Sequence, residues 1–427
     1  MEKINYKLGI SELYYAAITE TKIESTPAFT VTLKEPINSE RLRSACSQAL
    51  PLFPLFAATL EYKGEYSLIA HESEPPIITS PFEERAQYFG KSTGGYLFRI
   101  CVDGRKMLFE WSRILTDEYG ARDFLLAILS LYFGESASAP VGDALQVYLE
   151  TLTENREKTS LQTSKSTDKN EKKTEEKKDY SRIKSAGIPT RKNPRGARIH
   201  TLSVPVSELC AASGRENASP ESVLIPIFAN ILHRRARSDE ANITADVTLN
   251  CRNADIDSMH NLTVTKTLTY SGLFGKTEVK RVMELYEQML ESAKNSDSIK
   301  KEAMRTAEDL TPLVTLRPRF LRDLVSLAVS KAVMGERNDF SFVNLGTVRL
   351  SDTVREQIEE ISILSAPSTT DATISLLEIS GKLIITVSEN YIDEGIISDF
   401  IGICARLGIN ISVKSRTEFT SSRLKIK

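Results

Sequence analysis

Residues that bind metals or form disulfides are scarce in this chain of 427 residues, which has five cysteines and four histidines. The cysteines are scattered and never spaced as C-x-x-C, which argues against a zinc site and against a disulfide framework. No group of histidine, cysteine and carboxylate residues has metal-ligand spacing either. We therefore expect no bound metal and a reducing compartment, with unpaired thiols at Cys46, Cys101, Cys210, Cys251 and Cys404.

Long apolar runs and an excess of charge of one sign are also absent. No apolar stretch approaches the roughly 18 residues that span a bilayer, and residues 1–6 lack the apolar core of a signal peptide. The net charge of -2 gives no basic surface for nucleic acid or anionic lipid. No G-x-x-x-x-G-K-[ST] phosphate loop occurs. We expect a cytoplasmic protein without a membrane span or a nucleic-acid partner.

The chain does have enough apolar sequence, 41% of its residues, to build two or three domains with substantial cores. Lysine, glutamate, threonine, serine and aspartate dominate residues 153–196, where few large apolar residues can offset the entropy of ordering. This segment predicts a flexible linker, whose basic part at 191–198 either stays solvated or contacts an acidic partner. The predicted boundaries are 1–152 for an N-terminal half and 197–427 for a C-terminal half.

Strand and helix patterns alternate in the first half. Apolar and polar residues alternate as in strands, Asp103-Gly104 is a strong hairpin turn, and Asn38 or Ser39 is a suitable helix N-cap. Strands are expected at 29–33, 57–62, 66–69, 96–102 and 106–111, and helices after Asn38 or Ser39 and along the apolar stripe from Ala121 to Tyr132.

The second half repeats this mixture without a strict sequence repeat. Strands are expected at 199–204, 243–249, from 261, at 339–344, 372–379, 382–388 and 409–413, and helices after Pro205, from Ser219, over about 277–295, on to about 332, and over 392–407. The fold class is therefore α/β (α+β), with two halves that each pack helices on a mixed sheet and a cleft between them.

The segment 111–121 combines a strand end, a tight loop and a helix start. The hairpin strand 106–111 leads directly into this loop, which reads Ser-Arg-Ile-Leu-Thr-Asp-Glu from Ser112 to Glu118. Other landmarks in order are Pro51 to Pro54, Asn250-Cys251-Arg252 with Asn261-Leu262, and Phe342 to Gly346. With these landmarks the chain resembles the bacterial alcohol acetyltransferase-like branch of the chloramphenicol acetyltransferase and condensation-domain superfamily. The resemblance covers nearly the whole chain outside the linker.

The superfamily loop reads H-H-x-x-x-D-G, and its second histidine is catalytic. By resemblance, Ser112 stands at the first histidine, Arg113 at the catalytic one and Glu118 at the glycine. The resemblance assigns Asp117 a structural role, in which it holds a distant arginine, while capping of the next helix is the alternative. Gly120 belongs to the same structural part of the motif. The residues expected to line the central channel are Ser112, Arg252, Asn261, Val343, Asn344 and Gly346. Val343 stands where the family often has a serine. The alternative for Arg252 is a solvated arginine, and the alternative for Asn261 is a turn asparagine.

The resemblance implies transfer of an acyl group from coenzyme A or a carrier protein to an alcohol or amine. The histidine acts as the general base, which typically contributes roughly 10²–10⁴ in rate. A guanidinium stays protonated at neutral pH, so Arg113 cannot take that role but can bind an anion. No bound cofactor is expected, and acyl-CoA or an acyl carrier protein is the expected co-substrate or partner of an active enzyme.

Three interpretations of the site follow. The protein is an inactive homologue that serves as a binding module for an anion, or it is an acyltransferase with a relocated base at Glu118 or His260, or it transfers acyl groups slowly by positioning alone. A glutamate needs burial to act as a base near neutral pH, and His260 is alternatively a surface histidine.

Overall fold

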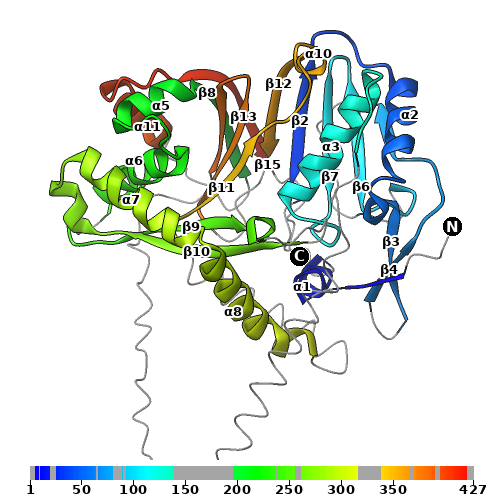
Figure 1. The fold of residues 1–427 in the computed structure, drawn as a ribbon, viewed down its shortest axis with the longest axis horizontal. Coiled ribbons are helices and arrows are strands. Elements are labelled where there is room, and N and C mark those ends of the chain that lie inside the picture. The colour runs from blue at the N-terminus through cyan, green and yellow to red at the C-terminus, as the bar shows by residue number, and fades with distance from the viewer. Residues whose placement is uncertain are drawn as a thin grey trace, which may run out of the picture.

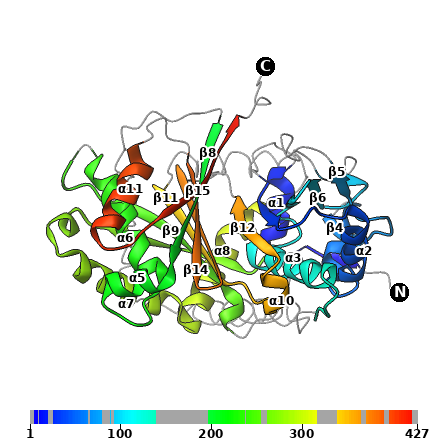
Figure 2. The same cartoon turned by 90° about the horizontal axis from the view of Figure 1, so that it is seen from above.

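The computed structural model describes residues 5–8, 10–19, 26–63, 66–79, 89, 93–138, 196–236, 238–254, 261–315, 338–364, 370–389 and 395–420. These residues form two lobes that lie side by side (Figures 1 and 2). We call the described residues before 139 together with strand β12 the N-terminal lobe, and the remaining described residues the C-terminal lobe.

The N-terminal lobe begins with a short strand and a helix and continues through two hairpins to helix α3. Its elements are β1 Asn5–Lys7, α1 Ile10–Thr19, β2 Ala28–Leu33, α2 Ser39–Ala49, η1 Pro54–Ala57, β3 Ala58–Tyr62, β4 Tyr66–Ala70, β5 Ile77–Thr79, β6 Phe98–Asp103, β7 Lys106–Trp111 and α3 Glu118–Tyr132.

The C-terminal part of the chain contributes the larger sheet and one strand of the other lobe. Its elements are β8 Gly196–Pro205, α5 Val206–Ser213, α6 Pro220–Arg234, β9 Ile243–Asn250, η3 Cys251–Ala254, β10 Thr263–Tyr270, η4 Gly272–Lys276, α7 Val279–Ala293, α8 Ser296–Thr315, β11 Phe340–Thr347, α10 Asp352–Arg355, β12 Ile358–Leu364, β13 Ala372–Ile379, β14 Lys382–Glu389, α11 Gly395–Arg406 and β15 Ser412–Thr420.

The two large sheets are mixed. The seven-stranded sheet has the order β10-β9-β11-β13-β14-β8-β15, in which β11 runs parallel to both of its neighbours and the other pairs are antiparallel. The five-stranded sheet has the order β12-β2-β7-β6-β5, and a three-stranded sheet β1-β4-β3 lies beside it. Strand β12 reaches the N-terminal lobe from late in the chain and pairs antiparallel with β2, as its orange ribbon beside the blue one shows (Figure 1).

Each lobe has its own apolar core. Aromatic rings fill the N-terminal one, where Phe56 stacks on Phe124 of α3 with ring centroids 3.9 Å apart, and Trp111 is fully buried against Phe29. In the C-terminal lobe, Phe228 of α6 packs edge-on against Phe340 of β11. Phe124 thus anchors α3 in the first core, and Phe340 anchors β11 in the second.

The sequence predicted the architecture well. The mixed α/β class, both hairpins of the N-terminal lobe, the helix capped by Asn38 and the hairpin β13–β14 are confirmed. The last strand was placed too early, since β15 begins at Ser412 rather than at residue 409. Residues 139–195 lie outside the described residues, so the linker and the two boundaries stay predictions. The short elements β1, α1, β5, α10 and β12 were not foreseen.

Among the described residues, no helix combines the length and the apolar character needed to cross a bilayer.

Candidate ligand site between the lobes

The loop from β7 to α3 is buried and held by its own hydrogen bonds. The backbone N–H of Ser112 donates to the Leu97 carbonyl at 2.8 Å, and the Ser112 hydroxyl accepts from the N–H of Ile114 at 3.2 Å. Both Ser112 and Ile114 are almost fully buried. These hydrogen bonds position Arg113 and Asp117 within the loop and Glu118 at the start of α3.

Asp117 connects this loop to helix α3 and to the other lobe. Its Oδ1 accepts from the N–H groups of Tyr119 and Gly120, both at 3.0 Å, which caps the helix. Its Oδ2 accepts from the Arg252 Nη1 at 2.9 Å and from the N–H of Leu262 at 2.8 Å. The cap and the contact with a distant arginine, which the sequence left as alternatives, occur together.

Arg113 forms an ion pair with Glu118, five residues further along the chain. Its Nη2 donates to Glu118 Oε1. The guanidinium also lies over the ring of Tyr15 in α1, 5.7 Å from the ring centroid, and its Nη1 donates to the Tyr15 hydroxyl at 3.4 Å. The Arg113 carbonyl accepts from the Asn261 side chain. The charge of Arg113 is thus neutralised by a nearby carboxylate in the first turn of α3.

Glu118 has a buried carboxylate, as a relocated base would need, but this carboxylate is engaged. Only 7% of its side chain is exposed, and it lies in the first turn of α3, where the helix dipole favours an anion. An oxygen that accepts a charge-assisted hydrogen bond from a guanidinium is poorly available to a substrate proton. His260, the other candidate base, lies outside the described residues.

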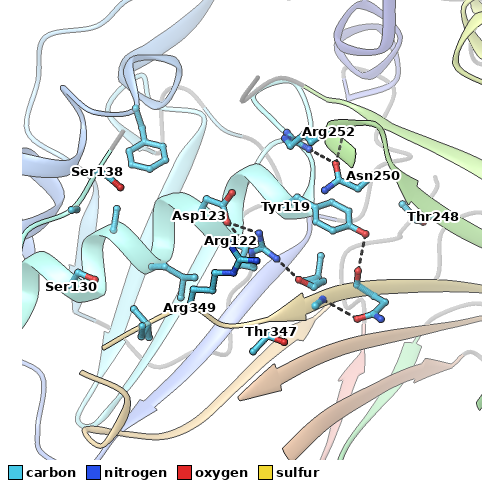
Figure 3. Close-up of a pocket in the computed structure, with 18 of the residues that line it drawn as sticks. Tyr119, Arg122, Asp123, Ser130, Ser138, Thr248, Asn250, Arg252, Thr347 and Arg349 are labelled. Carbon is cyan, nitrogen blue, oxygen red and sulfur yellow. Dashed lines mark hydrogen bonds and ion pairs between the residues drawn. The ribbon is translucent and has the colours of Figure 1, made fainter. Parts of the chain in front are cut away.

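A cavity of about 830 Å³ lies between the lobes, and Tyr119 is one of the residues that line it. Tyr119 donates its hydroxyl to the Asn344 carbonyl at 2.8 Å, and Arg122 donates to the Leu345 carbonyl, so α3 is tied to β11 across the cavity. Figure 3 shows the side chains of Tyr119, Arg122 and Asp123 projecting from α3, with Asn250 and Arg252 on the facing segment.

The ionisable side chains that line this cavity are mostly paired with each other. Arg122 Nε donates to Asp123 Oδ1 at 2.8 Å, and Lys294 Nζ donates to Glu221 Oε1 at 2.7 Å. Ser351 donates its hydroxyl to Glu135 Oε1 at 2.6 Å. The pKa of the Tyr119 hydroxyl is raised by burial and by the carboxylates of Asp117, Glu221 and Glu118. Tyr119 therefore stays a neutral donor at physiological pH.

The sequence-predicted site residues fall into two groups. Arg252, Asn344 and Gly346 line the cavity, and Gly346 has the positive φ of 69° that lets its N–H reach the Asn344 side chain at 2.9 Å. The second group belongs to the loop and to the core around it, and is not among the described residues that line the cavity: Ser112, Arg113, Asp117, Glu118, Gly120, Asn261 and Val343.

Sequence reasoning missed the polar residues that give the cavity its character. These include Glu221, Lys294 and Arg349, which come from three distant parts of the chain. One signal was available on α3, since the lining residues Tyr119, Arg122, Asp123, Leu126, Ala127 and Ser130 follow each other at helical spacing. A second apolar or polar stripe opposite the core stripe is typical of a helix that also faces a cleft.

The described residues contain no group of three or more histidine, cysteine or carboxylate side chains that could hold a metal ion. Burial raises the pKa of the Cys251 thiol to about 12, and the nearby Asp117 carboxylate adds to this rise. A neutral thiol is a poor metal ligand and a poor nucleophile.

Comparisons with solved structures identify the fold. The chain is similar to the epimerization domain of tyrocidine synthetase B, with 14% identity, 95% of this chain and 96% of that chain covered and a TM-score of 0.59. It is similar to the condensation domain of the Monacolin K polyketide synthase MokA at 12% identity, with 95% and 96% covered and a TM-score of 0.59. It also matches TRI101 of F. sporotrichioides, solved with coenzyme A and T-2, at 10% identity, with 96% and 99% covered and a TM-score of 0.59.

These likenesses show that the chain has the two-lobed fold shared by condensation domains and CoA-dependent acetyltransferases. No profile of a known protein family matches the sequence, and no curated protein matches it significantly.

Proposed function

We propose that this protein is a non-catalytic member of the acyltransferase and condensation superfamily, which binds a small ligand in the cavity between its lobes. The observation that carries the proposal is the ion pair between Arg113 and Glu118. By resemblance, Arg113 occupies the position of the catalytic histidine and Glu118 that of the motif glycine. The two departures from the motif carry opposite charges that compensate each other. The pair therefore leaves no uncompensated buried charge at the position where the base would stand.

The arginine at position 113 argues against ordinary acyl transfer. Attack of an alcohol or amine on a thioester requires removal of a proton, and a guanidinium cannot accept one. Glu118 is held by Arg113, which leaves His260 and positioning alone as the other possible contributions to rate. Arg113 itself is a poor anion site for the same reason. An anionic ligand is better served by Arg349, a cavity-lining arginine that makes no ion pair among the described residues.

The cavity supports the binding half of the proposal. Its volume of about 830 Å³ lies in the range of small-molecule and cofactor sites. One neighbour in fold was solved with coenzyme A and T-2, and another with C8-CoA and Leu-SNAC. By analogy with these neighbours in fold, the expected ligand is a thioester, its acyl acceptor or a related small molecule. The thioester would be carried by coenzyme A or by a carrier protein.

An acyl-transfer assay tests the proposal. The purified protein is incubated with acetyl-CoA or octanoyl-CoA and with 1-octanol or octylamine, and the ester or amide is measured by mass spectrometry. We expect no product above the uncatalysed rate. Turnover that is lost in His260→Ala or in Glu118→Gln would instead establish the relocated base.

Restoring the motif gives the complementary result. The double variant Arg113→His with Glu118→Gly recreates the H-x-x-x-D-G pattern, and Arg113→Gln with Glu118→Gly is its matched control without a base. Because a positioned general base contributes roughly 10²–10⁴ in rate, the first variant should exceed the second by at least about 10². Equal rates in the two would contradict the assignment of position 113 to the base.

A further inference from the structure

Arg349 is a cation of the cavity wall without an ion-pair partner among the described residues. It is exposed and lines the cavity, so it lies on a part of the wall that solvent reaches (Figure 3). Three other cationic side chains of the described segments line the cavity, and each has a partner: Arg122 pairs with Asp123, Arg252 with Asp117 and Lys294 with Glu221. A guanidinium pairs well with an oxyanion that accepts two parallel hydrogen bonds. Arg349 therefore marks the place of an acidic group of the ligand.

The carboxylates of the cavity select the kind of oxyanion. Asp123, Glu135 and Glu221 line the same cavity, so negative charge that Arg349 leaves unbalanced is repelled there. A carboxylate carries a single negative charge, which the one guanidinium neutralises. A phosphate monoester carries a charge of about −1.5 to −2 at pH 7, and its excess would act against the three acidic side chains. The cavity therefore favours a carboxylate over a phosphate.

Apolar side chains continue the cavity wall from Arg349. Leu350 follows it directly in the chain and packs against the core of the N-terminal lobe, which includes Phe53 and Leu126. All three of these apolar residues line the cavity. An aliphatic chain that covers them is removed from water, and each methylene that is buried in this way strengthens binding. The part of the ligand next to its acidic group is therefore expected to be aliphatic.

We infer that the cavity binds an aliphatic monocarboxylate, with its acidic group on Arg349 and its chain along Leu350, Phe53 and Leu126. This inference rests on the proposed function only in that the cavity holds a ligand. Arg349 takes no part in the ion pair of Arg113 and Glu118. A free acid of this kind carries none of the phosphates of coenzyme A, so the two classes of ligand can be told apart by titration.

The test compares four probes by isothermal titration with the full chain at pH 8. The probes are octanoate, methyl octanoate, which lacks the charge, octyl phosphate, which is a dianion at this pH, and butanoate, which has the shorter chain. Octanoate should bind about tenfold more tightly than its ester, as hydrogen bonds between charged groups predict. It should also bind more tightly than octyl phosphate, and at least about tenfold more tightly than butanoate. Failure of any of these three preferences overturns the inference.

Two variants assign the two parts of the ligand. Arg349→Ala should abolish the preference for octanoate over its ester. Its control is Arg215→Ala, an exposed arginine outside the cavity lining that likewise makes no ion pair among the described residues. Leu350→Ala should weaken binding of octanoate and of its ester by a similar factor of about three. A preference that persists in Arg349→Ala or vanishes equally in Arg215→Ala, or unchanged binding of both probes to Leu350→Ala, overturns the inference.

Octanoyl-CoA separates the inference from the proposed function. Binding of octanoyl-CoA without any binding of octanoate overturns the inference and leaves the proposed ligand-binding function in place. Acyl-transfer turnover in the assay described above overturns the proposed function alone, since the preferences among the four probes do not depend on it. The two failures are therefore distinguishable.

Discussion

Asp117 and Arg252 belong to different lobes and are joined by an ion pair of 2.9 Å. Asp117 begins helix α3, and Arg252 follows strand β9. The aspartate also accepts the backbone N–H of Leu262, so two contacts from the C-terminal lobe meet on one oxygen. The same carboxylate caps a helix of one lobe and holds the other lobe, which couples the loop of Arg113 to the boundary between them.

Replacing Arg252 should destabilise the protein strongly. Its side chain is 13% exposed and that of Asp117 is 1% exposed, and removal of one partner of a buried pair typically costs about 3 kcal/mol. Urea unfolding of Arg252→Ala measures this loss in the free energy of unfolding. The control is Arg105→Ala, since Arg105 pairs with Glu359 at the same 2.9 Å but at the surface. Its effect should stay below about 1 kcal/mol, and equal losses in the two variants would contradict the assignment.

The ion pair of Arg113 and Glu118 should appear as a coupling energy. In a double-mutant cycle with Arg113→Gln and Glu118→Gln, the free energies of unfolding should be non-additive by about 1–2 kcal/mol, because the pair is largely buried. The exposed pair Arg281–Glu284 gives the reference cycle, with an expected coupling below about 0.5 kcal/mol. Additive effects at positions 113 and 118 would show that the two side chains are not paired in solution.

The reactivity of each cysteine thiol should report on its burial, and that of Cys251 on the packing at the boundary between the lobes. Burial raises the pKa of the Cys251 and Cys404 thiols to about 12 and that of Cys46 and Cys101 as well. Thiolates are the reactive species, so iodoacetamide at pH 8 should modify these four only after unfolding. Cys210 is partly exposed and should react first. Mass spectrometry of digested protein reads out each site, and rapid modification of Cys251 in the native protein would mean that the segment of Arg252 opens.

Ionisation of the Asp246 carboxyl should lower the free energy of unfolding as the pH rises. Burial raises the pKa of this carboxyl above its usual value near 3.8, although Asn338 and Thr267 donate hydrogen bonds to it. The folded state therefore holds the proton more tightly than the unfolded state, and the free energy of unfolding should fall from about pH 4 upward until the raised pKa is passed.

Asp246→Asn should remove that fall. The amide oxygen can accept the same two hydrogen bonds without a charge, so the variant should gain stability relative to the wild type at pH 7 and little at pH 4. Urea unfolding at both pH values measures the difference, with the exposed Asp239→Asn as a control. A gain that is equal at both pH values would contradict the role of the carboxyl proton.

Local sequence was sufficient for the elements that carry the loop. The hairpin expected from Asp103-Gly104 joins β6 to β7 through Gly104 and Arg105, Asn38 caps α2, and Asp117 caps α3. Arg113 and Glu118 are only five residues apart, so their pairing was within reach of the sequence as well. Turns, caps and short-range pairs depend on residues that are close in the chain. Their patterns can therefore be recognised from the sequence without a structure.

The sequence by itself thus determined the mixed α/β class and the hairpins, and by resemblance it assigns Arg113 to the position of a catalytic base. Only the tertiary structure decided that β12 joins the sheet of the N-terminal lobe and that Glu221, Lys294 and Arg349 line one cavity. Strand partners and cavity walls depend on contacts between residues that are far apart in the chain. No local periodicity encodes such contacts, because the packing of two separate cores selects them.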